Sequence, residues 1–331
     1  MGVSARVANC ITNKLGRGER TVLLSLIGLL IIVVVVFAIA PTLLRDEQPT
    51  PTMTAESGTE IVDELSSQGW DCFESDGDAH LQRCFENESD EVTASVSVLS
   101  DGGTVAMVKA EATGSDSDAI DDSLSAAAEA MDQALLPDSE AQIKGPVSGK
   151  AFEAQELPGG VLVETTLVSV KVLNGKDLGA SAVTAYLPKA LPLPDQLTFG
   201  LEKKDFECHV ELSLLCESSI DGVDVSISQR VRPVDPNMIE VRLDYIDEAT
   251  SGSQSKAAEV REQLGKILAA DDVGLTDADG AEFLTQKAKT GHRGDFAGYE
   301  MAVVTGVDDA SGSMKIDFTS VVPEATSAID W

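Results

Sequence analysis

Two similar stretches, DELSSQGWDC at residues 63–72 and FGLEKKDFEC at residues 199–208, open two related halves of the chain. Aligned on their final cysteines, they share a leucine, an aromatic residue and an acid: Leu65 with Leu201, Trp70 with Phe206, Asp71 with Glu207, and Cys72 with Cys208. A second cysteine follows in each half, Cys84 and Cys216. The pattern predicts two copies of one module.

The order of the expected elements also repeats. Each half continues with two alternating strands, an alanine-rich helix, a long apolar strand and a closing strand. In the first half these are residues 92–98, 105–110, 121–136, 160–172 and 180–186. In the second half they are residues 223–227, 239–245, 255–269, 300–307 and 315–320.

We therefore expect an α+β fold with two tandem modules, each with a mostly antiparallel sheet and one packed helix. Both helices show an apolar stripe: Leu124, Ala128, Met131 and Leu135 in the first, and Val260, Leu264, Ile267 and Leu268 in the second. The alternative is two unrelated α+β domains whose cysteines match by chance. Trp70 and Phe206, each two residues before a cysteine, are expected to pack in the two cores beside the cysteines.

Residues 21–44 carry no charged side chain, and their apolar part reads VLLSLIGLLIIVVVVFAIA at residues 22–40. This length suits the hydrocarbon core of a bilayer, so we predict one transmembrane helix. Basic residues precede it, whereas Asp46 and Glu47 follow it, which puts residues 1–20 in the cytoplasm and the bulk of the chain outside. The alternative is a signal peptide cleaved after Ala38-Ile39-Ala40, which would export the same residues.

These observations predict six regions along the chain. They are a basic cytoplasmic tail (1–20), the transmembrane helix (21–44), a Pro/Thr-rich stalk (45–58), the first module (59–187), a Pro-rich linker (188–196) and the second module (197–331).

Four cysteines lie in the predicted extracytoplasmic part, two in each module. An even number of cysteines in an oxidising compartment favours disulfides, and the repeat favours Cys72–Cys84 and Cys208–Cys216 among the three pairings. A metal site that adds His80 or His209 is the alternative. Adjacent strand residues such as Cys208 and His209 point to opposite faces, which disfavours it.

The net charge and the short motifs limit the classes of function that fit this chain. A formal net charge of −32 disfavours a nucleic-acid partner and suits cations or a basic protein surface. The strings Ser253-Gln254-Ser255-Lys256 and Lys289-Thr290-Gly291 resemble serine acyl-transfer motifs, but they lie close together and the serines fit helix caps. Acids at Asp116, Asp118 and Asp277 also read as caps or turns. Asn87-Glu88-Ser89 fits a glycosylation sequon.

We expect a non-enzymatic, single-pass cell-membrane protein whose extracytoplasmic part binds or assembles with another envelope or membrane protein. No catalytic, cofactor-binding or metal-ligating residue is assigned. The bilayer is the expected partner of residues 21–44. Two alternatives stay open: a binder of a small ligand or cation in the cleft between the modules, and a serine acyl-transfer enzyme using Ser253 and Lys256.

Overall fold

The computed structural model describes residues 50–75, 80–87, 92–101, 103–137, 142–146, 150–175, 189–211, 213–230, 238–244, 253–286, 291–305 and 313–320. The chain divides into two compact units, residues 1–48 and residues 49–331, and the described residues all belong to the second. The predicted tail and transmembrane helix lie outside the described residues, as does the expected strand at 180–186.

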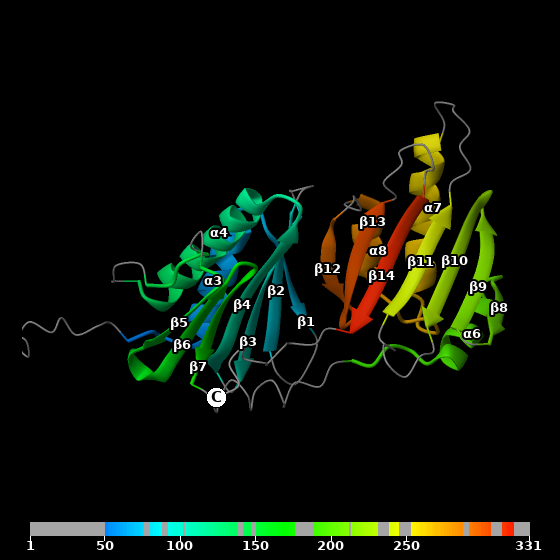
Figure 1. The fold of residues 1–331 in the computed structure, drawn as a ribbon. Coiled ribbons are helices and arrows are strands. Elements are labelled where there is room, and N and C mark those ends of the chain that lie inside the picture. The colour runs from blue at the N-terminus through cyan, green and yellow to red at the C-terminus, as the bar shows by residue number, and fades with distance from the viewer. Residues whose placement is uncertain are drawn as a thin grey trace, which may run out of the picture. The chain divides into compact units, whose positions relative to one another are not determined.

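The first module contains α3 (Ala55–Ser67), β1 (Asp71–Ser75), β2 (His80–Glu86), β3 (Val92–Asp101), β4 (Thr104–Gly114), α4 (Ser117–Leu135), β5 (Phe152–Leu157), the 3₁₀ turn η1 (Pro158–Gly160), β6 (Val161–Thr166) and β7 (Ser169–Asn174) (Figure 1). The second contains α6 (Pro194–Glu202), β8 (Glu207–Val210), β9 (Ser213–Ile220), β10 (Val223–Arg230), β11 (Met238–Asp244), α7 (Ser253–Leu268), α8 (Ala278–Gln286), β12 (Arg293–Phe296), β13 (Tyr299–Thr305) and β14 (Ser313–Ser320).

The two sheets have the same topology. Each has seven antiparallel strands, in the order β1-β2-β3-β4-β7-β6-β5 in the first module and β8-β9-β10-β11-β14-β13-β12 in the second when read from the corresponding edge. Strand β8 therefore corresponds to β1, and β12 corresponds to β5. The prediction of two similar α+β modules is confirmed, and the shared strand order extends the likeness beyond the aligned cysteines.

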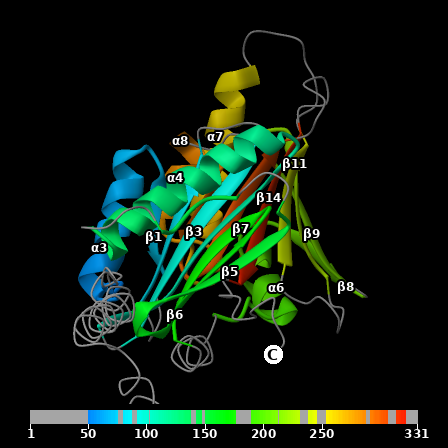
Figure 2. The ribbon, with the colours of Figure 1, turned by 60° about the vertical axis from the view of Figure 1, so that its left-hand side comes forward.

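Helices cover one face of each sheet. In the first module α4 packs across β3, β4 and β7, and α3 packs beside it (Figure 2). The predicted stripe of α4 is buried, and the helix begins after Asp116, whose carboxylate accepts the backbone N–H groups of Asp118 and Ala119. In the second module α7 packs against α8. The expectation of one helix per module was wrong: α3 joins α4 in the first module, and α6 and α8 join α7 in the second. The start of α3 was missed because residues 45–58 read as a polar stalk.

The apolar run at residues 160–172 is not one long strand. It forms the hairpin of β6 and β7, with Leu167 and Val168 at the turn. The run hides its turn because neither glycine nor proline marks it, and because both strands bury valines against the same core. Among the described strands, β7 occupies the place in the first sheet that β14 occupies in the second.

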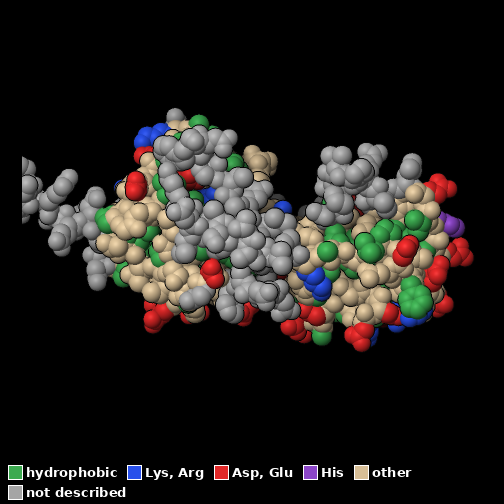
Figure 3. Space-filling model, turned by 90° about the horizontal axis from the view of Figure 1, so that it is seen from below, with side chains coloured by type: hydrophobic (Ala, Val, Ile, Leu, Met, Phe, Trp, Pro, Cys, Tyr) green, Lys and Arg blue, Asp and Glu red, His purple; other side chains and the backbone are tan. Residues whose placement is uncertain are grey.

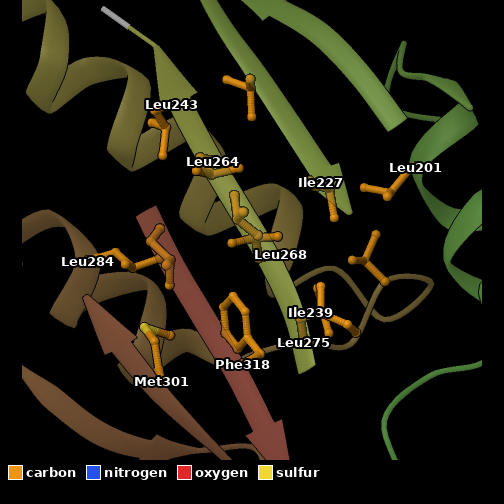
Figure 4. Close-up of a cluster of buried hydrophobic side chains, with 14 of the residues drawn as sticks. Leu201, Ile227, Ile239, Leu243, Leu264, Leu268, Leu275, Leu284, Met301 and Phe318 are labelled. Atoms are coloured by element: carbon orange, nitrogen blue, oxygen red, sulfur yellow. The ribbon is translucent and has the colours of Figure 1, made fainter. Parts of the chain in front are cut away.

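A separate hydrophobic core lies between sheet and helices in each module. Figure 4 shows the second core, where Leu243 and Ile239 of β11 and Phe318 of β14 meet side chains of the helices. Its predicted helix stripe is buried at Val260, Leu264 and Leu268, with Ile267 partly buried beside it.

The predicted stalk and linker are shorter than expected. Pro51 and Met53 are buried, the backbone N–H of Thr52 donates to the carbonyl of Leu135, and Thr54 caps α3. The first module therefore begins near residue 50 rather than residue 59. In the linker, Lys189 to Leu193 belong to the second module: the carbonyl of Ala190 accepts from the Tyr299 hydroxyl, and that of Pro192 accepts from the amide of Gln229.

Candidate functional site

The predicted disulfides are both present. Cys72 and Cys84 are directly opposite on β1 and β2, and Cys208 and Cys216 are directly opposite on β8 and β9. Each bond links the first two strands of its module. Trp70 and Phe206 are buried in the same cores as these cysteines, as the repeat predicts.

The most elaborate side-chain site lies where β1 and β2 of the first module contact β12 of the second. We call it the junction. Strands β1 and β12 are both sheet edges, but no strand ladder joins them in the described residues. Side chains connect the two modules instead, and those of the first module come from the sheet face opposite to its helices.

One part of the junction is a hydrogen-bond clamp. Asn87, 7% exposed, donates from Nδ2 to the carbonyl of Arg293 at 2.9 Å, and its Oδ1 accepts the backbone N–H of Arg293 at 2.8 Å. The same Nδ2 donates to Asp71 Oδ2 at 2.8 Å. The amide thus satisfies both backbone groups of one residue on an edge strand, as a neighbouring strand would.

A second part is an ion-pair network. Arg83 on β2 places its two terminal nitrogens 2.9 Å from Asp295 Oδ1 and 2.8 Å from Glu300 Oε2. Arg293 pairs with the other carboxylate oxygen of Glu300 at 3.3 Å. The side chains of Asp295 and Arg83 are only 1% and 11% exposed, so water screens this pair little.

A third part is aromatic. The rings of Phe73 and Phe296 meet edge to face across the junction with centroids 5.0 Å apart, and Phe283 of α8 continues the contact at 5.1 Å. On the other side Phe73 lies 5.9 Å from Phe85, whose ring is covered by the Arg83 guanidinium. Gly294 makes room for this packing, because a Cβ there would lie 2.9 Å from the Phe73 ring. Four of the nine phenylalanines of the chain therefore gather at the junction.

A shallow pocket of about 300 Å³ opens beside these rings, and we call it the junction pocket. Phe73, Phe283 and Phe296 provide its apolar lining, and Asp71, Asp279, Glu282 and Gln286 provide its polar lining. The alternative of a small ligand or cation in a cleft between the modules stays a prediction, for which this pocket is a candidate location. Its residues come from β1, α8 and β12, which nothing in the sequence connects.

A second, larger cleft of about 680 Å³ lies on the second sheet. Its carboxylates are Asp205, Glu207, Glu217, Asp224 and Asp244, with Glu207 opposite Glu217 and Asp224 opposite Asp244 in the strand register. No group of three or more Asp, Glu, His or Cys in the described part of the chain is arranged to hold a metal ion. Figure 3 shows acidic side chains spread over one face of the molecule, with hydrophobic side chains between them.

The outer strand β5 forms a surface of a different kind. It pairs with β6 alone, and Phe152 to Glu156 are exposed along it. Phe152 is 41% exposed, and Leu167 and Val168 of the adjoining turn are 50% and 49% exposed. We call β5 with Leu167 and Val168 the β5 edge.

The remaining residues that the sequence singled out either have a structural role or lie outside the described residues. Asp277 caps α8 by accepting the N–H of Gly280, and its second oxygen accepts that of Ala297. Ser253 and Lys256 lie in the first turn of α7, with side chains outside those described, and Lys289 and Thr290 are also outside. The sequence did not reveal Arg83 and Asp295, because each looks like an ordinary surface charge. It did not reveal the clamp of Asn87, because the sequon pattern indicates modification rather than packing.

Comparisons with family models, with curated proteins and with solved structures gave no match. Within the described residues no helix combines the length and apolarity that a membrane crossing needs, and the predicted anchor at 21–44 is not among those residues.

Proposed function

We propose that this chain is a membrane-tethered, extracytoplasmic binding protein that assembles with another membrane or envelope protein through its β5 edge. One observation carries the proposal: the repeat places an equivalent edge strand in each module, but only one of the two strands is covered. In the second module the fifth strand, β12, is covered by the first module at the junction. In the first module the fifth strand, β5, is exposed.

The chemistry of the β5 edge supports an incoming extended segment. Its outer backbone groups have no strand neighbour among the described residues, so a partner strand can extend the sheet. Phe152, Leu167 and Val168 offer apolar contacts at one end of the strand. Glu153 pairs with Lys150, so Glu156 is the acid that adds negative charge to the edge, which suits a basic segment and discourages pairing with another copy.

The short tether supports a partner in or near the membrane. Only residues 45–49 separate the predicted anchor from the packed chain, and at most about 3.5 Å per residue can be spanned. Thr50 lies beside Gly159 in the turn that follows β5. The turn at that end of β5 thus contacts a residue only a few positions along the chain from the predicted anchor.

Site-specific photo-cross-linking tests the proposal. A photoreactive phenylalanine at position 152, in the full-length chain in its native membrane, should give one discrete cross-linked product. Phe199 on α6 is the matched control, because it is 63% exposed but lies in the other module. The product should vanish in a Leu167→Asp, Val168→Asp variant. Absence of a product, or the same products from both positions, would contradict the proposal.

Export can be tested separately. A reporter enzyme that is active only in an oxidising compartment, fused after Trp331, should be active. Activity only of a reporter that needs the reducing interior would refute the membrane topology.

A second candidate function is binding of a small cationic ligand in the junction pocket. The observation in its favour is the combination of aromatic and acidic lining residues from both modules in one cavity.

A further inference from the structure

The charges around the junction pocket are unbalanced. The two arginines of the junction are already engaged by Asp295 and Glu300. Among the described residues that line the pocket, three are acids and none is a lysine, arginine or histidine. Asp71 already accepts a hydrogen bond from Asn87, so Asp279 and Glu282 form the acidic part of the lining that a ligand can meet.

The acids and the rings occupy different parts of the pocket lining. Asp279 and Glu282 are exposed and three residues apart on α8, which places them as neighbours on one helix surface. In the described part of the chain, Glu282 accepts a side-chain hydrogen bond from the neutral amide of Gln286 alone. Phe283 and Phe296 are 5% exposed and Phe73 is partly exposed, so the floor of the pocket is apolar.

We propose that the junction pocket binds an alkylammonium group, with the ammonium at Asp279 and Glu282 and the alkyl chain against Phe73 and Phe296. The inference rests on the second candidate function and names its ligand class. Anions are repelled by the carboxylates of Asp279 and Glu282, and a neutral apolar ligand would desolvate these groups without compensation. An aliphatic chain that ends in a cation satisfies both parts of the lining. Such a group can come from a free amine or from a lysine side chain.

Fluorine NMR of the purified full-length chain, labelled with fluorophenylalanine, tests this directly. The resonances of Phe73, Phe283 and Phe296 are assigned by single Phe→Leu variants. The probes are pentylammonium, acetyl-lysine methylamide and, as the neutral isostere, acetyl-norleucine methylamide. Saturable shifts confined to the three rings are expected with the charged probes alone. A response to both charged probes indicates general amine binding, and a response to the lysine probe alone indicates recognition of a side chain.

Matched variants distinguish binding in the junction pocket from nonspecific attraction of a cation to the acidic chain. Asp279→Asn with Glu282→Gln should weaken binding about tenfold, on the basis of two lost charge contacts. Glu217→Gln with Asp224→Asn, in the other acidic cleft, should leave binding unchanged. No saturable shift, an equal response to the norleucine probe, or an equal loss in the control variant would overturn the inference. Photo-cross-linking at position 152 would be unaffected by that failure, so the β5-edge proposal is judged independently.

Discussion

The side-chain amide of Asn87 holds the backbone of Arg293 in both directions, with hydrogen bonds of 2.9 and 2.8 Å. It thereby closes the edge of the second sheet against the first module. A glycan on Nδ2 would remove one bond and could not fit at a side chain that is 7% exposed. The Asn87-Glu88-Ser89 sequon is therefore explained by packing, and Asn87 is expected to be unmodified in the folded chain.

Replacing Asn87 with alanine should lower the free energy of unfolding by about 2 kcal/mol, because the N–H and carbonyl of Arg293 lose their partner in a buried place. Urea denaturation of the full-length chain measures this loss. Asn174→Ala is the matched control, since Asn174 makes a single bond to the carbonyl of Val105 within the first module. An Asn87→Ala loss no larger than that of the control would contradict the role of the clamp.

Arg83→Met should be more costly, about 3–5 kcal/mol, because it removes the cation that pairs with Asp295 and Glu300 at the junction. Adding Asp295→Asn should recover part of the loss by removing a buried charge. The exposed pair of Lys266 and Glu262 gives the comparison: Lys266→Met should cost less than about 1 kcal/mol. Equal effects of Arg83→Met and Lys266→Met in urea denaturation would show that the buried pair is dispensable.

Gly294→Ala should destabilise the junction, because the added methyl group meets the rings of Phe73 and Phe296. Overpacking of this kind costs about 1–3 kcal/mol. Shortening the opposing ring with Phe73→Leu should relieve part of the strain, so the double variant should be more stable than the sum of the two single effects predicts. Strict additivity in thermal or urea denaturation would mean that the two residues do not press on each other.

Burial raises the pKa of the Tyr299 hydroxyl above its ordinary value. Tyr299 therefore ionises more readily in the unfolded chain than in the folded one. The stability that the neutral hydroxyl contributes is fully present below a pH of about 10, and it is lost as the pH rises through the folded pKa. Absorbance titration of tyrosinate should show one tyrosine that ionises at a higher pH than the others, and this transition should be absent in Tyr299→Phe. A titration that is identical in the two proteins apart from amplitude would contradict the shift.

The repeat, the disulfides and the helix stripes were predictable because each leaves a local pattern. Cys72 and Cys84 are close in sequence, and Leu124 to Leu135 follow a helical period. The turn at Leu167 was missed because no glycine or proline marks it. The helix at Ala55–Ser67 was missed because its first residues look like a polar stalk.

The junction could not be predicted at all. Arg83 and Asp295 are far apart in the chain, and each looks like an ordinary surface charge in a sequence with many charges. Their pairing depends on which sheet edges meet, and that is decided by packing of whole modules. Phe73 and Phe296 likewise show no relationship until both sheets are in place.

The junction is expected to fasten the two modules into one cooperative unit, and tryptophan fluorescence during urea unfolding measures this coupling. With Trp331→Phe, Trp70 reports on the first module; with Trp70→Phe and Phe206→Trp added, the equivalent position reports on the second. The two reporters should give the same midpoint, and the midpoints should separate when Arg83→Met and Asn87→Ala are introduced. Separate midpoints with the junction intact would show that the modules unfold independently and would contradict the account.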